Sequence, residues 1–313
     1  MYTNSIEMLE VSPRDGLQNE PEQVPTATKL TLIERAVAAG TRRIEVTSFV
    51  NPKAVPQMAD ADEVCAGLPD RDDVTYIGLV MNMRGAERAI ATGKINELGA
   101  VCVATDTFAH KNQRQTSDGS VDMAKEIIAL GKQSGLTAQA TIAASFGCPF
   151  EGEVAEDRVV AMAAALAEAG PVEIALADTI GVGNPAHVAR LVAKVRKIID
   201  PLPVRLHFHN TRGTGLANVW AAIGEGASTI DASIGGLGGC PFAPGAAGNV
   251  ATEDVAYMLE RAGVETSLDL DALIQTNRWF AGEMNKDLPA MVGKAGGFPR
   301  VAEDKPQEER EVA

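Results

Sequence analysis

Two histidines separated by one residue carry the clearest chemical signal in the chain. His207 and His209 lie in the strand-like run VRLHFHN (204–210). Alternate residues of a strand share a face, so both imidazoles point to one side and Phe208 points to the other. Asp15 and Asn249 also fall near predicted strand ends and complete a mixed nitrogen and oxygen set. Such a set favours Mg²⁺ or Mn²⁺, although strand histidines held by backbone or carboxylate partners are the alternative.

Three charged residues near strand ends suggest acid–base or electrostatic roles. Glu45 stands inside an apolar strand, where an unpaired carboxylate would cost several kcal/mol. Arg14, just after the first predicted strand, is its natural cationic partner. Asp178 ends the sixth predicted strand, and it either handles a proton or caps the turn DTIGVG.

Cys240 differs from the other cysteines because it lies in a glycine-rich loop, GGLGGCPFAPGAAGN (235–249). A thiol on such a loop could exchange a proton with a substrate carbon or act as a nucleophile. Cys65, Cys102 and Cys148 are expected to be buried structural thiols. The cysteines are scattered without a C-x-x-C pair, which indicates reduced thiols in a cytoplasmic enzyme.

These residues need a scaffold that brings distant segments together, and the sequence predicts one. Eight strand-like runs occur at residues 6–13, 42–50, 74–80, 98–106, 136–145, 172–178, 204–210 and 228–236. Helical spacing of apolar residues is clearest at 28–39, 121–133, 157–169 and 185–199. Strand–helix alternation of this length predicts a (β/α)8 TIM barrel, whose active site lies at the carboxyl ends of the strands. An open doubly wound sheet is the alternative, but no G-x-G-x-x-G follows the first strand.

The organisation is that of one catalytic domain over residues 1–297, with added C-terminal helices from about residue 264 and a charged, frayed tail over 298–313. The 313 residues carry a net charge of −14, which argues against binding to nucleic acid or to an anionic membrane. A phosphate-bearing ligand would need a local basic patch or helix N-termini. We expect a cytoplasmic protein, because the sequence shows no secretion signal and no membrane-spanning run.

Several long motifs resemble the 3-hydroxy-3-methylglutaryl-CoA lyase family, a group of metal-dependent carbon–carbon lyase barrels. The motifs are SPRDGLQNE (12–20), IEVTSFVNPKAVPQMADADEV (44–64), FGCPFEGEV (146–154), ADTIGVGNP (177–185), HFHNTRGTGLAN (207–218) and GGLGGCPFAPGAAGNVATEDVAYML (235–259). The resemblance implies a divalent cation bound by Asp15, His207, His209 and Asn249. It also implies retro-Claisen cleavage of an acyl-CoA to acetyl-CoA and acetoacetate.

The resemblance further implies a role for each remaining candidate. Arg14 would stabilise charge on the thioester oxygen, Glu45 would hold Arg14, Cys240 would protonate the enolate carbon, and Asp178 would take the hydroxyl proton. The predicted substrate contacts are Gln18, Asn112, Thr179 and Arg212, with Lys53 and Lys111 as weaker candidates for the CoA phosphates. Pairing through the C-terminal helices would give a homodimer.

Departures from the family pattern concern specificity. Asn210 replaces an acid, Arg212 an aromatic residue and Thr214 a glutamine, so the acyl group can differ, with citramalyl-CoA as the competing substrate. A condensing synthase of the isopropylmalate or citramalate type is a second alternative. Against it, such enzymes have R-D-G-E-Q where this chain has Leu17, and they lack the Cys240 loop. A non-catalytic barrel is a third, disfavoured because the metal and thiol residues are all present.

Overall fold

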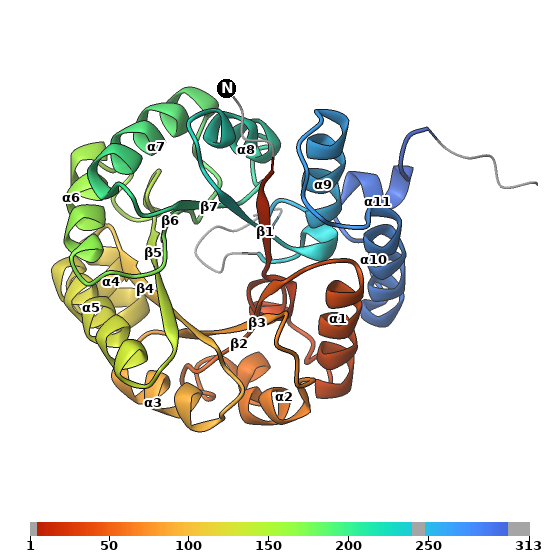
Figure 1. Ribbon diagram of the computed structural model, residues 1–313, viewed down its shortest axis with the longest axis horizontal. Coiled ribbons are helices and arrows are strands. Elements are labelled where there is room, and N and C mark those ends of the chain that lie inside the picture. The colour runs from red at the N-terminus through yellow and green to blue at the C-terminus, as the bar shows by residue number, and fades with distance from the viewer. Residues whose placement is uncertain (1–4, 240–247, 300–313) are drawn as a thin grey trace, which may run out of the picture.

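The computed structural model describes residues 5–239 and 248–299, and in this range the eight strands close into one parallel barrel (Figure 1). The strands pair in chain order, and β8 pairs with β1. Their bounds are β1 Glu7–Glu10, β2 Arg43–Ser48, β3 Thr75–Val80, β4 Glu97–Val103, β5 Thr137–Ala143, β6 Ile174–Asp178, β7 Val204–Phe208 and β8 Thr229–Ala232. The (β/α)8 prediction is confirmed, and the doubly wound alternative is wrong.

Helices form the outer ring of the barrel and cover its apolar outer face (Figure 1). They are α1 Thr26–Ala38, α2 Ala61–Gly67, α3 Met83–Ala91, α4 Asp106–Gln113, α5 Ser117–Gln133, α6 Glu156–Ala167, α7 Pro185–Ile199, α8 Gly215–Gly224, α9 Thr252–Arg261, α10 Leu270–Met284 and α11 Met291–Ala295. The start of α7 shows how the local sequence begins a helix. Asn184 accepts a hydrogen bond from the His187 amide at 3.1 Å. Pro185 fits the first turn because it has no amide hydrogen that needs a partner. None of the helices in the described ranges is long and apolar enough to cross a membrane.

Two strands that matter for the site end earlier than the sequence predicts. β1 ends at Glu10, and the chain enters one turn of π-helix over Ser12–Gly16 (η1). Pro13 explains the early end, because it has no amide hydrogen for a strand ladder. β7 ends at Phe208, and His209 continues only as a single bridge to Asn249. The ends of both strands therefore curl into the mouth of the barrel.

The barrel interior is more polar than is usual for this fold. The main apolar core lies between strands and helices, whereas Leu9, Val11 and Ile77 form a small separate cluster. Branched apolar layers normally fill such a barrel. Here buried charged side chains, including Glu45 and Arg205, occupy much of the interior.

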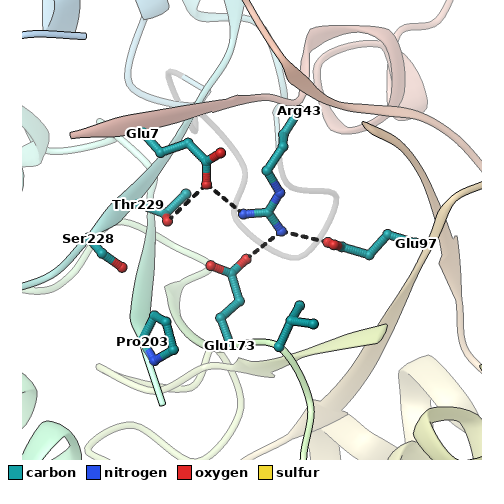
Figure 2. A pocket seen from close by; sticks show the side chains of 8 residues that line it. Glu7, Arg43, Glu97, Glu173, Pro203, Ser228 and Thr229 are labelled. Atoms are coloured by element: carbon teal, nitrogen blue, oxygen red, sulfur yellow. Dashed lines mark hydrogen bonds and ion pairs between the residues drawn. The ribbon is translucent and has the colours of Figure 1, made fainter. Parts of the chain in front are cut away.

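A charged cluster closes the amino end of the barrel, where the strands begin. Arg43 lies 2.8 Å from Glu7, 2.6 Å from Glu97 and 2.9 Å from Glu173 (Figure 2). A hollow of about 370 Å³ lies beside this cluster and is also lined by Thr229. In this fold the amino end usually contributes to stability, and the carboxyl end carries the active site.

After β8 the chain forms α9 and then two further helices on the same side, α10 and α11 (Figure 1). α10 packs against α1 and α9, and α11 packs against α9 and α10. Asp254 fixes the start of α11 by accepting hydrogen bonds from the amides of Met291 at 3.0 Å and Val292 at 2.7 Å. The helix predicted after residue 264 corresponds to α10.

Candidate metal centre and active site

Asp15, His207 and His209 converge at the carboxyl end of the barrel. One potential ligand atom from each lies within 4.8 Å of the others. Oδ2 of Asp15 is 3.9 Å from Nε2 of His207 and 3.9 Å from Nε2 of His209. The two rings stand side by side, with centroids 5.1 Å apart. The π-helical turn brings Asp15 to this point, and the end of β7 brings the histidines.

Asn249 joins the cluster although it is 40 positions beyond His209. Backbone hydrogen bonds from Asn210 to Gly248 (2.8 Å) and from Val250 to Phe208 (3.0 Å) pair this segment with the end of β7. The Asn249 amide then donates to Oδ2 of Asp15 at 2.7 Å and to the Leu237 carbonyl at 2.9 Å. The four predicted ligands thus lie together.

Gly238 lets the chain lie close against the cluster. Its φ of +121° is rare for residues with a side chain, and a Cβ atom there would come 2.2 Å from Nδ2 of Asn249. Any larger residue would therefore displace Asn249.

The electrostatics of the cluster favour a bound positive charge. Burial alone would raise the pKa of Asp15, but Arg14 and the two histidines outweigh it and hold that pKa well below its usual range. Burial would lower the pKa of His207, yet its hydrogen bond to Asp231 and the charge of Asp15 leave it raised. Burial, and then the charge of His207, lower the pKa of His209 to about 4, so this ring is neutral as a metal ligand must be.

The residues fit a divalent cation. Oδ1 of Asn249 is buried and has no hydrogen-bond partner among the described residues. An orphaned buried acceptor beside a carboxylate and two imidazoles is what a cation would satisfy. The set of two nitrogen and two oxygen donors suits Mg²⁺ or Mn²⁺. Asp15, His207, His209 and Asn249 would hold it.

Arg14 and Glu45 form the buried ion pair that the sequence predicts. Nε and Nη2 of Arg14 donate to Oε2 of Glu45 at 2.9 and 2.6 Å, and Nη1 donates to Oδ1 of Asp15 at 2.6 Å. A bulge in the pairing of β2 with β3 occurs between Glu45 and Thr47 and helps to aim Glu45. Within the described residues, three of the five guanidinium hydrogens are engaged, which leaves two for a ligand.

Asp178 lies beneath the turn that follows β6. Its two carboxylate oxygens accept the amide hydrogens of Val182 and Gly183, each at 2.9 Å. These bonds match the turn-capping alternative, and they leave a proton-handling role as a prediction. Burial raises the pKa of Asp178 despite the two amide donors. Its neighbour Thr179 is also engaged, since its hydroxyl oxygen accepts the Ala144 amide at 2.9 Å.

The other predicted contacts lie around the mouth with varied exposure. Gln18 is half-buried and lies 3.4 Å from the Ser48 hydroxyl. Asn112 is exposed on α4. Arg212 is exposed, and its Nη1 donates to the carbonyls of Ile180 at 3.0 Å and Gly181 at 2.9 Å. Cys240 lies outside the described residues.

Sequence reasoning missed Asp231, Arg205 and the amino-end cluster. Asp231 accepts a hydrogen bond from the His207 ring, whose Nδ1 is 3.1 Å from its Oδ2. The same signal that singled out Glu45, a carboxylate within an apolar strand, was present here. Arg205 stands two residues before His207 and shares its face of β7, so strand alternation also pointed to it.

Comparisons with known proteins show the family of the chain. The HMGL-like family model matches residues 5–279. The chain is 42% identical over 309 residues to an (R)-citramalyl-CoA lyase from Chloroflexus aurantiacus, covering 95% of this chain and 97% of that protein. It is 40% identical over 289 residues to a hydroxymethylglutaryl-CoA lyase from Bacillus subtilis, covering 92% and 96%.

Solved structures show the same relationship. An HMG-CoA lyase from Acenitobacter baumannii, in complex with coenzyme A and 3-methylmalate, superposes with a TM-score of 0.90 at 44% identity. That match covers 97% of this chain and 98% of the other. An HMG-CoA lyase from Pseudomonas aeruginosa matches with a TM-score of 0.90 at 37% identity, covering 94% and 98%. The chain therefore belongs to the hydroxymethylglutaryl-CoA lyase family and is a carbon–carbon lyase.

Proposed function

We propose that this protein is a divalent-metal-dependent lyase that cleaves 3-hydroxy-3-methylglutaryl-CoA to acetyl-CoA and acetoacetate. The observation that carries the proposal is the convergence of Asp15, His207, His209 and Asn249 beside Arg14. Mg²⁺ or Mn²⁺ held by these four residues would lower the pKa of the substrate's tertiary hydroxyl and stabilise the resulting negative charge.

Arg14 is placed to stabilise the second charge of the reaction. When the bond between the carbinol carbon and the thioester α-carbon breaks, negative charge moves to the thioester oxygen. The two guanidinium hydrogens that Glu45 and Asp15 leave free can donate to this oxygen. Glu45 holds the guanidinium in a fixed orientation, so little reorganisation accompanies the reaction.

Two protons must move, and two residues are proposed for them. Asp178 is the candidate to remove the hydroxyl proton, and burial raises its pKa, which makes its carboxylate a stronger base. The Cys240 thiol is the candidate to protonate the enolate carbon. Support for Cys240 comes from its glycine-rich sequence context and from the family motif around it.

An acyl-CoA ligand is supported by the relatives, since the Acenitobacter baumannii structure contains coenzyme A with 3-methylmalate. Gln18, Asn112 and Thr179 are the proposed contacts for the acyl portion. The net charge of −14 opposes a phosphate ligand at long range, so the CoA phosphates need local cations. Lys53 and Lys111 are exposed and remain the candidates. We keep a cytoplasmic location and a homodimer as predictions.

The assay follows directly. Purified protein is incubated with 3-hydroxy-3-methylglutaryl-CoA and Mg²⁺ or Mn²⁺, and acetyl-CoA release is measured. We expect turnover that EDTA abolishes and that added metal restores. Turnover that persists in EDTA would refute the metal-dependent proposal. Condensation of acetyl-CoA with a keto acid, with release of free CoA, would favour the synthase alternative instead.

Citramalyl-CoA is the second candidate substrate, favoured by the 42% identity to a citramalyl-CoA lyase and by Arg212 near the mouth. Its acyl chain is one methylene shorter, a difference that a binding pocket typically discriminates by about 10–200-fold. The ratio of kcat/KM values for the two thioesters assigns the substrate. We expect the glutaryl compound to be faster, and a ratio that favours citramalyl-CoA by tenfold or more would reassign it.

A further inference from the structure

The wall of the barrel behind His207 contains a line of buried, alternately charged side chains. Arg43 pairs with Glu173 at 2.9 Å, and Glu173 lies 2.9 Å from Nε of Arg205. Arg205 in turn donates to Asp231, and Oδ2 of Asp231 lies 3.1 Å from Nδ1 of His207. Nothing in the proposed mechanism uses Arg205 or Asp231.

Strand register places Asp231 beside His207. The pairing of β7 with β8 sets His207 opposite Asp231 and Arg205 opposite Thr229. Asp231 is 4% exposed and Arg205 is 2% exposed, so neither exchanges its partners for water. Arg205 is also anchored on β5, where it donates to Gln139 and, at 2.9 Å, to the Thr141 hydroxyl.

The hydrogen bond to Asp231 fixes which nitrogen of His207 carries the proton. A carboxylate paired with a guanidinium is ionised and can only accept hydrogen bonds, so Nδ1 must be the donor. The neutral ring then has its lone pair on Nε2, the atom that lies 3.9 Å from Asp15. Such outer partners orient metal ligands and strengthen their binding in other metalloproteins.

We propose that Asp231, braced by Arg205, is a positioning residue that holds His207 as the Nδ1–H tautomer with Nε2 directed at the metal. The inference rests on the metal site of the proposed function. It extends that site to a second layer of residues that do not touch the ion or the substrate.

The test compares Asp231→Ala with Asp231→Asn, and it measures Mn²⁺ affinity by the electron paramagnetic resonance signal of free Mn²⁺. We expect Asp231→Ala to weaken Mn²⁺ binding by about 10–100-fold. The Asn side chain keeps an oxygen that can accept from Nδ1 and from Arg205, so Asp231→Asn should lose only about threefold. At saturating Mn²⁺ most of the turnover of Asp231→Ala should return.

A second readout separates positioning from a merely structural role. The chain has four histidines, so ¹⁵N spectra of the imidazoles can be assigned with His207→Gln and His209→Gln. His207 should be the Nδ1–H tautomer in the wild type and in Asp231→Asn, and a mixture in Asp231→Ala. Glu97→Gln is the matched control, because it removes a buried carboxylate that pairs with Arg43 and, within residues 5–239 and 248–299, makes no hydrogen bond or ion pair with Arg205 or His207. It should change neither readout.

A folded Asp231→Ala protein with wild-type Mn²⁺ affinity and an unchanged His207 tautomer would overturn the inference. An equal loss of affinity in Glu97→Gln would also overturn it, since the effect would then be general to the barrel charges. If the wild type binds Mn²⁺ and shows these variant effects but cleaves no acyl-CoA thioester, the proposed function fails and the positioning role stands.

Discussion

The two ends of the barrel solve the same problem of buried charge in opposite ways. At the amino end, the carboxylates of Glu97 and Glu173 are each paired with the protein's own arginine, Arg43 (Figure 2). At the carboxyl end, Asp15 faces two imidazole nitrogens at 3.9 Å, which is too long for a hydrogen bond. Asn249 there keeps a buried oxygen without a partner in the described part of the chain.

This difference separates a stabilising cluster from a binding site. Burying a charge is costly unless it is paired, so a cluster that is complete in itself contributes to folding and has no need of a ligand. A cluster that leaves a buried amide oxygen without a partner among the described residues, and two imidazole nitrogens out of hydrogen-bond reach of a carboxylate, is complete only when a cation binds. Both ends contain carboxylates paired with an arginine, and the buried Asn249 oxygen and the two imidazoles around Asp15 distinguish the carboxyl end.

The largest expected effect comes from removing a charge at the carboxyl end. Asp15→Asn should reduce turnover by at least about 10³-fold, because it removes the negative ligand and a partner of Arg14. Steady-state kinetics with acetyl-CoA detection measure the loss, and circular dichroism checks the fold. Glu97→Gln at the other end is the control and should keep turnover within about twofold. A similar loss in both variants would mean that the two ends do not differ in function.

At the amino end, a substitution is expected to reduce stability and to leave turnover nearly unchanged. Arg43→Met leaves three carboxylates without their shared cation, so the free energy of unfolding should fall by about 3–5 kcal/mol. Urea unfolding measures this change, and kcat of the folded fraction should stay near the wild-type value. Arg43→Lys is the control, because it keeps the positive charge and should reduce the free energy of unfolding less. A loss below about 1 kcal/mol would show that the cluster contributes little to stability.

Glu253 sharpens the comparison because no arginine or lysine pairs with it in the described part of the chain. It is buried on α9 and accepts the Gly235 amide and, at 2.5 Å, the Asn277 amide. Burial raises its pKa to about 8, so the folded state binds a proton that the unfolded state releases near pH 4.5. Stability should therefore decrease as pH rises from about 5 to 8, by on the order of 2–4 kcal/mol from this group.

Glu253→Gln mimics the protonated form and should remove that decrease. Its stability relative to the wild type should rise between pH 5.5 and 8.5 when both are unfolded by urea. Glu156→Gln is the control, since neighbouring Lys194 lowers the pKa of Glu156 and places its titration below this pH window. Parallel pH profiles for the wild type and Glu253→Gln would contradict the prediction.

The smallest effect concerns ligand-linked stability. Mn²⁺ at 100 times its dissociation constant should add about 2.7 kcal/mol, which is a rise of about 4 °C in Tm for a chain of this size. The shift should be the same in Arg43→Met and absent in Asp15→Asn. Differential scanning calorimetry with and without EDTA measures it. An equal rise in Tm for Asp15→Asn would mean that Mn²⁺ binds at another site.

The convergence of the proposed ligands was predictable because parallel strands bring their carboxyl ends together. Once the barrel was inferred, polar residues just beyond strand ends had to meet at its mouth, as Asp15 and His207 do. The same rule ignores the residues that begin strands, so it missed Arg43 and Glu173. It also extended β1 three residues beyond its observed end at Glu10, because strand propensity does not show where the π-helical turn begins.

By itself, the sequence determined the alternation of strands and helices, the pairing need of Glu45 and the choice of the four residues proposed as metal ligands. These follow from local periodicity and from the cost of burying charge. Only the tertiary structure decided that Asp231 backs His207, because that contact depends on the register between β7 and β8. A slip of one residue would turn Asp231 to the opposite face, and no pattern within either strand records which register the closed barrel adopts.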